Sequence, residues 1–430
     1  MEMETKEKPE LSKNTASIVT AAITGLFTLL VALVQLAPTL GSLEDLMRVA
    51  VLAMMVLIPA IVGVAMFALL VRKFRWAFLA LLCGAALAAG VVLLYWNVRS
   101  RPGLQYVDGA EVSLYGGPGV GDAFESPQSL TAAGDILYLT DAGKIRRLED
   151  GKISTVDLPY LYDGHAAVVR AMGGDLYVLT GLFENEEQTL CYGFLRIRNG
   201  ETELISRPFE ARMGAFSISI SDFTFSRGNV LWFLQQYHVP DSSTPTTLLR
   251  MLPHDLATDT YGDPVTVMEL PYAAPEMENA CLVFDEEDNL YISAPEKGVL
   301  LRIGRDEQKS WTVFAGQEDV HAFNDRGDAA LFHPTALAVS GDFLYVLDHG
   351  VIRRVGLKGD QAGKLETLAG MPPDQAEHES QIEVDADGAA PGKEFAFYAD
   401  DRGSLTVDSR GRLVVSSPAD GFLFRVTASK

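Results

Sequence analysis

The chain has 430 residues, of which 48% are hydrophobic, and a formal net charge of −22. Residues 1–101 contain nine basic and six acidic side chains, so residues 102–430 carry 26 basic and 51 acidic ones, a net charge of −25. An acidic surface of this kind repels phosphates, which argues against a nucleic-acid partner. The three cysteines include no C-x-x-C pair, so the common zinc and thioredoxin-like motifs are absent from the sequence.

After a polar tail at residues 1–16, the sequence contains three apolar runs, at about residues 17–41, 49–71 and 76–98. A helix of about 20 apolar residues crosses the hydrocarbon core of a bilayer, so each run predicts a transmembrane helix. Trp76, Tyr95 and Trp96 lie at the ends of the third run, where interfacial aromatic residues are enriched. The lipid bilayer is therefore an expected partner, and residues 99–110 are the expected linker to the rest of the chain.

The distribution of lysine and arginine predicts how the three helices are oriented. The tail and the second loop lie on one side of the membrane and hold six of these residues, whereas the other side holds three. The positive-inside rule then predicts a multi-pass protein of the cell membrane, with a cytoplasmic N-terminus and an extracytoplasmic C-terminal domain. The centres of the runs carry no ionisable side chain, which favours a role in anchoring or assembly over ion transport.

The region after residue 110 contains an internal repeat. The segments Gly121–Arg147 and Phe332–Arg354 align without a gap over their core, at a constant separation of 207 residues. The matched pairs are Pro127 and Pro334, Leu130 and Leu337, Tyr138 and Tyr345, Asp141 and Asp348, and Ile145 and Ile352. A repeat at fixed spacing is typical of solenoid and propeller architectures.

A looser form of the unit occurs six times. Each copy has a strand of branched residues, a turn rich in glycine or asparagine, and a strand that begins at Leu137, Leu176, Leu231, Leu290, Leu344 or Leu413. A unit of four such strands is typical of a propeller blade. The last copy lacks a fourth strand, and Val112–Tyr115 resembles the missing one. We therefore predict an all-β six-bladed β-propeller over residues 111–430, closed by the strand at 112–115.

The stretch GDAALFHPTALAVSGDFLYVLDHGVIRRV, followed by TLAG, resembles the NHL repeat. Phe124 and Pro127 repeat its pattern in the first unit. The resemblance covers about residues 111–430 and implies a platform that binds proteins, RNA or small ligands. Related six-bladed propellers include metal-dependent lyases and lactonases. The acidic charge of this chain departs from the basic face expected of RNA-binding members.

Loops before the first strand and between the second and third strands of each blade share one face of a propeller, where ligand sites gather. Seven residues are predicted to lie there: His165, Asp222, Glu278, His333, Asp348, His349 and Asp400. His165 and His333 occupy equivalent positions in opposite blades and, with Glu278, could hold a divalent metal, zinc or calcium. The alternative is that both histidines are loop residues packed beside the repeat proline. Asp348 matches Asp141, which favours a structural role for it.

The sequence leaves more than one function open. No nucleophile elbow, phosphate loop or paired metal motif is present, so no catalytic residue and no cofactor are assigned. The first hypothesis is a membrane-anchored binding, sensing or interaction module for a protein, peptide or glycan, or for a small molecule at the propeller face. The second is an anchored metal-dependent lyase or lactonase-like hydrolase. The third is a structural subunit of a larger membrane complex.

Overall fold

The computed structural model describes most of the chain from residue 103 onward. The described residues are 103–117, 124–158, 166–184, 189–210, 212–213, 216–238, 245–306, 310–326, 328–372, 389–395, 397 and 403–427. They belong to the second of two units into which the chain divides, residues 102–430. The polar tail and the three expected transmembrane helices lie outside them. In the part that is described, no helix has the length and hydropathy needed to cross a bilayer.

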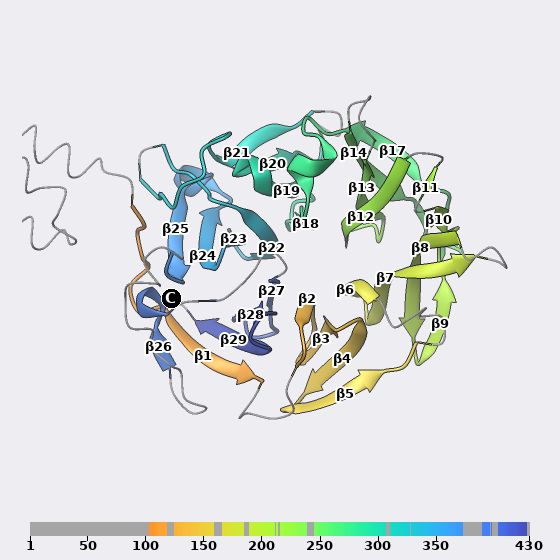
Figure 1. Cartoon of the computed structure of the whole chain (residues 1–430), viewed down its shortest axis with the longest axis horizontal. Coiled ribbons are helices and arrows are strands. Elements are labelled where there is room, and N and C mark those ends of the chain that lie inside the picture. Colours follow the sequence, from red (N-terminus) through yellow and green to blue (C-terminus); the bar gives the residue numbers. More distant parts are fainter. Residues whose placement is uncertain are drawn as a thin grey trace, which may run out of the picture. The chain divides into compact units, whose positions relative to one another are not determined.

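The described strands form six antiparallel sheets around a common axis (Figure 1). Blade 1 contains β2 (Pro127–Ala133), β3 (Ile136–Asp141), β4 (Lys144–Glu149) and β5 (Lys152–Val156). Blade 2 contains β6 (Ala166–Met172), β7 (Asp175–Glu184), β8 (Thr189–Arg198), β9 (Glu201–Leu204) and β10 (Phe209–Glu210). Blade 3 contains β11 (Arg212–Met213), β12 (Phe216–Phe225), β13 (Leu231–His238), β14 (Thr246–Leu252) and β17 (Val265–Glu269). A separate hairpin pairs β15 (His254–Asp255) with β16 (Thr260–Tyr261).

The second half of the ring follows the same plan. Blade 4 contains β18 (Leu282–Phe284), β19 (Leu290–Ala294), β20 (Val299–Ile303) and β21 (Thr312–Gly316). Blade 5 contains β22 (Pro334–Ser340), β23 (Phe343–Asp348), β24 (Val351–Gly356) and β25 (Leu365–Ala369). Blade 6 contains β27 (Leu405–Val407), β28 (Leu413–Ser417), β29 (Phe422–Thr427), β1 (Glu111–Gly116) and β26 (Ala389–Pro391). Short 3-10 helices lie at Ala274–Met277, Pro295–Lys297, Gly359–Gln361 and Gly392–Glu394.

Blade 6 is built from both ends of the described chain. The first strand, β1, pairs antiparallel with the last, β29, and places Val112 opposite Val426. Figure 1 shows the orange β1 beside the dark blue β29. The all-β six-bladed β-propeller predicted from the sequence is confirmed, and a strand from each end of the repeat region closes its ring. The outer edge of β1 is covered by β26, a strand that the sequence analysis did not predict.

The hydrophobic core is divided among the interfaces between blades. Six clusters of buried residues each join strands of two neighbouring sheets, so every adjacent pair of blades shares one cluster. The cluster between blades 2 and 3 contains Phe194, Phe223 and Phe233, whose rings meet edge to face. Successive side chains of a strand point to opposite faces of its sheet, and each sheet buries both faces against its neighbours, so a middle strand such as β19 is buried at every position.

The turns between the first and second strands explain the glycine and asparagine of the repeat. Each turn contains a residue with positive φ, which favours glycine, asparagine or aspartate. These residues are Gly134, Gly173, Gly174, Asn229, Asp288, Gly341 and Gly411. The Ala-Gly endings of the outer strands have a second cause. A Cβ atom on Gly370 would lie 2.3 Å from the carbonyl oxygen of Gly350, and one on Gly316 would lie 2.3 Å from that of Gly298.

Candidate functional site

Two of the predicted site residues, His333 and His349, lie together on one face of blade 5. His333 precedes β22 and His349 occupies the turn between β23 and β24, with a φ of 48°. Their ring centroids are 6.2 Å apart. His333 also lies near blade 4, where its Nδ1 is 3.7 Å from a carboxylate oxygen of Glu296. The loops before a first strand and between second and third strands therefore share this face.

Aromatic side chains extend the two imidazoles into a larger cluster. The ring of Phe332 lies 5.1 Å from that of His349 and is stacked on Phe323 at 5.0 Å with an interplanar angle of 6°. The exposed His321 contacts the edge of Phe332 and bonds its carbonyl oxygen through Nδ1 at 2.7 Å. We call His321, Phe323, Phe332, His333 and His349 the imidazole–phenylalanine cluster. It combines partly exposed apolar rings with hydrogen-bonding nitrogens, the composition of a recognition surface.

Asp348 lies beneath this cluster and holds its backbone in place. Its carboxylate accepts hydrogen bonds from the amides of Phe332, at 2.9 Å, and His333, at 2.6 Å. Arg353 of β24 donates to the other oxygen at 2.8 Å. Burial raises the pKa of Asp348, against the lowering effects of Arg353 and the two amides. Because its side chain is 0% exposed, Asp348 supports the face from within and does not present a carboxylate to a ligand there.

Asp222 lies in the wall around the propeller axis and is also committed to protein partners. It sits on β12, the inner strand of blade 3, and accepts a hydrogen bond from Arg170 of β6 at 2.5 Å. Its second oxygen accepts from the amide of Leu282 in blade 4 at 3.1 Å. Burial alone would lower the pKa of Arg170, but the charge of Asp222 outweighs it and the pKa lies above its ordinary value. One carboxylate therefore joins three consecutive blades.

Hydroxyl groups link other neighbouring inner strands in the same way. Ser404 of blade 6 accepts a hydrogen bond from the amide of Leu130 in blade 1 at 3.0 Å. Ser129 of blade 1 accepts from the amide of Val169 in blade 2 at 2.9 Å. These contacts satisfy backbone donors that face the adjacent blade, where no strand pairing reaches them. The polar residues around the axis therefore serve the closure of the ring.

Cys281 lies beside the Arg170–Asp222 pair. Burial raises the pKa of its thiol well above the ordinary value, and the charge of Asp222 adds to this effect. A thiol in such surroundings stays protonated at neutral pH, whereas nucleophilic cysteines need a lowered pKa. Cys281 is therefore a buried structural residue.

The remaining predicted site residues do not complete a metal centre in the part of the chain that the structure describes. Glu278 is exposed at the end of the 3-10 helix Ala274–Met277, and His165 and Asp400 lie outside the described residues. No group of three or more His, Cys, Asp or Glu side chains among the described residues is arranged to hold a metal ion. Because His165, one of the three expected ligands, is not among the described residues, the zinc or calcium site stays a prediction.

The sequence analysis missed the arginines that pair with the predicted aspartates. Arg353 and Arg146 follow the aligned Ile352 and Ile145 in both copies of the repeat, so the aligned motif already contained them. Arg170 had no such signal, because its partner Asp222 is 52 residues away in a different blade. Asp325, the second carboxylate partner of Arg353, could not be predicted for the same reason, since it lies 28 residues away in the sequence.

Comparisons with known proteins give distant similarities. No protein-family model matches the chain, and the search of curated proteins gives no match. The virginiamycin B lyase from Staphylococcus aureus is similar over 74% of this chain and 99% of its own, with 12% identity and a TM-score of 0.42. A luciferin-regenerating enzyme is similar over 74% and 95%, with 12% identity and a TM-score of 0.46. The aldose sugar dehydrogenase from Escherichia coli is similar over 74% and 100%, with 12% identity and a TM-score of 0.40.

These similarities are too distant to carry an activity over to this chain. The observed sheets define the class of the domain, a six-bladed β-propeller. The resemblance to NHL repeats stays a prediction from the sequence.

Proposed function

We propose that the chain is a membrane-anchored β-propeller, with a cytoplasmic N-terminus and an extracytoplasmic propeller, that binds a protein, peptide or glycan ligand. The observation that carries this proposal is the imidazole–phenylalanine cluster on the face of blades 4 and 5. Its five side chains come from the loop before β22 and the turn after β23, and Glu296 of blade 4 borders it. Loops held by a rigid scaffold are the usual place for ligand contacts.

The chemistry of the cluster favours binding over catalysis. The stacked rings of Phe323 and Phe332 offer apolar surface, and three imidazoles border it. The nearby Asp348 is neutralised by a buried arginine and is not free to act as an acid or base. The surrounding charge favours a basic ligand, since residues 102–430 carry a net charge of −25 and Glu296 lies beside His333.

The test uses the full chain in lipid nanodiscs, probed with arrays of basic peptides and of glycans. We expect binding of at least one probe class, and we expect Phe332→Ala to weaken it by about tenfold or more, as for an aromatic residue central to an interface. Trp311→Ala is the matched control, because Trp311, beside β21, is an aromatic residue 37% exposed whose ring contacts Tyr272, which is not a member of the cluster. The proposal fails if no probe binds, or if the two variants bind alike.

The alternative expected from the sequence, a metal-dependent lyase or hydrolase, has a separate test. Metal analysis of the purified full chain would show one equivalent of zinc or calcium if a metal site exists. His333→Ala should then lose that metal, because His333 is the expected ligand that lies on the described face. Such a result would support the enzyme and replace the binding proposal.

A further inference from the structure

Residues 103–107, here called the leading segment, follow the third expected transmembrane helix and are fixed to the outer strand of blade 5. Tyr106 forms a parallel bridge with Thr367 of β25. The amide of Val107 donates to the carbonyl of Thr367 at 2.8 Å, and the amide of Thr367 donates to that of Gln105 at 2.9 Å. The hydroxyl of Tyr106 also donates to the carbonyl of Gly370 at 2.8 Å. The leading segment therefore adds one parallel bridge to the outer edge of the blade 5 sheet.

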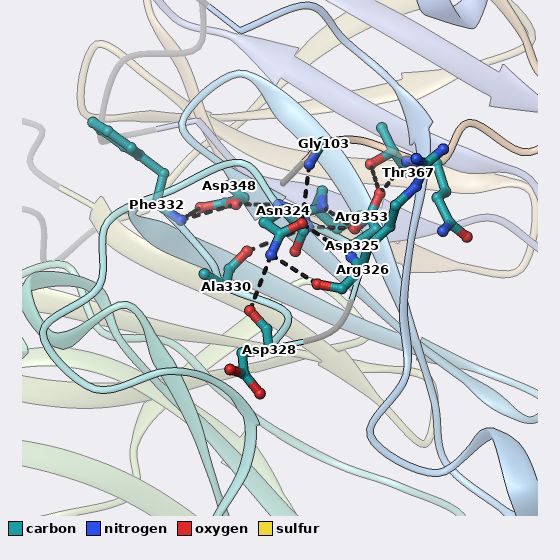
Figure 2. A network of polar contacts seen from close by, with 11 residues as sticks. Gly103, Asn324, Asp325, Arg326, Asp328, Ala330, Phe332, Asp348, Arg353 and Thr367 are labelled. Carbon is teal, nitrogen blue, oxygen red and sulfur yellow. Dashed lines mark hydrogen bonds and ion pairs between the residues drawn. The ribbon is translucent and has the colours of Figure 1, made fainter. Parts of the chain in front are cut away.

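A single carboxylate, that of Asp325, holds both the leading segment and the outer strand. One of its oxygens accepts from the amide of Gln105 at 2.7 Å and from the hydroxyl of Thr367 at 2.6 Å. The neighbouring Asn324 accepts from the amide of Gly103 at 3.0 Å, and the amide of Asp325 donates to the carbonyl of Gly103 at 3.1 Å. Figure 2 shows these contacts converging between the leading segment and blade 5.

The other oxygen of Asp325 binds Arg353, which connects this site to the recognition face. The side chains of Arg353, Asp325 and Asp348 are all 0% exposed. Arg353 contacts Asp325 with one part of its guanidinium and donates to Asp348 with Nη1 at 2.8 Å. Asp348 accepts in turn from the amides of Phe332 and His333. A continuous path of charge-assisted hydrogen bonds therefore runs from Gln105 to the backbone of the imidazole–phenylalanine cluster.

We infer that this path couples the leading segment to the imidazole–phenylalanine cluster, so that detachment of the segment loosens the face and movement of the face loosens the segment. The physical reason is that a buried charge left without its partner is costly, so the ends of the path favour each other's ordered state. Coupling of this kind is reciprocal by thermodynamic necessity. Its use in carrying a signal towards the membrane rests on the proposed function; the coupling itself does not.

Amide hydrogen exchange of the full chain in nanodiscs tests the coupling without any ligand. Gln105→Pro removes the amide that donates to Asp325, and we expect the amides of Phe332 and His333 to exchange about tenfold faster than in the original chain. Gln105→Ala is the matched control, since the side chain of Gln105 is exposed and the variant keeps the amide. The amides of Glu125 and Ser126, which donate to Asp141 in blade 1, report any global loss of structure.

The reverse experiment starts at the face. Phe332→Pro removes a donor to Asp348, and the amides of Val107 and Thr367 should then exchange faster while those of blade 1 keep their protection. The inference is overturned if Gln105→Pro accelerates exchange only at Val107 and Thr367, or if Phe332→Pro leaves these two unchanged. A chain that binds no probe but shows both effects would reject the proposed function and keep the coupling.

Discussion

Blades 1 and 5 contain the two closest copies of the repeat, and the ion pair at the centre of each has different surroundings. In blade 1, Asp141 accepts from the amides of Glu125 and Ser126, both at 2.8 Å, and Arg146 pairs with it at 3.2 Å. In blade 5, Asp348 and Arg353 repeat this arrangement. The side chain of Arg146 is 22% exposed, whereas that of Arg353 is 0% exposed.

The difference comes from residues outside the repeat. Arg353 is enclosed by Asp325, which in turn binds the leading segment and Thr367. In blade 1 the equivalent position on the outer strand is the exposed Thr155, which accepts a hydrogen bond from Arg146 at 2.6 Å. In both blades, the aspartate and arginine of the repeat hold the loop before the first strand in place. In blade 5, the arginine also binds Asp325, which holds the leading segment, about 250 residues earlier in the chain.

The largest effect is expected from removing the two central arginines. Arg353→Met leaves two buried carboxylates without their cation, and should lower the free energy of unfolding by about 3–5 kcal/mol. Arg146→Met should cost about 1 kcal/mol, because Arg146 is partly in solvent and pairs with one carboxylate, whereas Arg353 pairs with two. Urea unfolding followed by tryptophan fluorescence measures both. Equal losses would show that the enclosure by Asp325 contributes nothing to the difference.

A second contrast concerns the end of the outer strand. Gly370 ends the outer strand of blade 5 with a φ of 97°, and an alanine Cβ there would meet the carbonyl of Gly350 at 2.3 Å. Gly370→Ala should therefore cost about 2–3 kcal/mol through strain and displaced backbone. Gly341→Ala in the same blade is the control, because a Cβ atom at this position would meet no neighbouring atom. The only cost of this substitution is the strain of a side chain at a φ of 58°, about 1 kcal/mol. Similar melting temperatures for the two variants would contradict the close approach.

A smaller difference in the free energy of unfolding is expected between variants of Thr367 and Thr155, the outer-strand residues beside Arg353 and Arg146. Thr367→Val removes a donor to the buried Asp325 and should cost about 1.5 kcal/mol. Thr155→Val removes an acceptor at the surface and should cost under about 0.5 kcal/mol. Urea unfolding of the two variants under one set of conditions measures this difference. If Thr155→Val were the more costly variant, the enclosed site of blade 5 would not be the stronger of the two.

The same comparison shows how far the sequence could lead. The pairs Asp141 with Asp348 and Ile145 with Ile352 predicted the repeated blade, because local turns and strand alternation leave a periodic trace in sequence. The same periodicity placed His333 and His349 on one face, but it matched His333 with His165 of the opposite blade and did not predict its contact with His349. The leading segment left no such trace, since Gln105 and Asp325 are 220 residues apart and meet only in the folded ring. Residues of the site that depend on contacts between distant segments therefore lay beyond the sequence analysis.

The smallest effect is expected where an ion pair is exposed, which extends the contrast between the buried pair of blade 5 and the more open pair of blade 1. Arg198 on β8 pairs with Asp259 in the β15–β16 hairpin, and their side chains are 45% and 41% exposed. The hydrogen bond from Arg198 lowers the pKa of Asp259 to about 2, compared with about 4 in the unfolded chain. This carboxyl therefore stabilises the fold above about pH 4, and its contribution to stability is lost as the pH falls towards 2. Asp259→Asn should make the melting temperature fall less steeply between pH 4 and pH 2 and should lower it slightly at pH 7, by the small contribution that solvent screening leaves to an exposed pair, while Arg198 keeps its second partner, Asp175. The measurement is a pair of thermal melts across that range, at low and high salt. If the variant lost stability at pH 7 as heavily as Arg353→Met does, burial would not be what separates strong from weak ion pairs in this propeller.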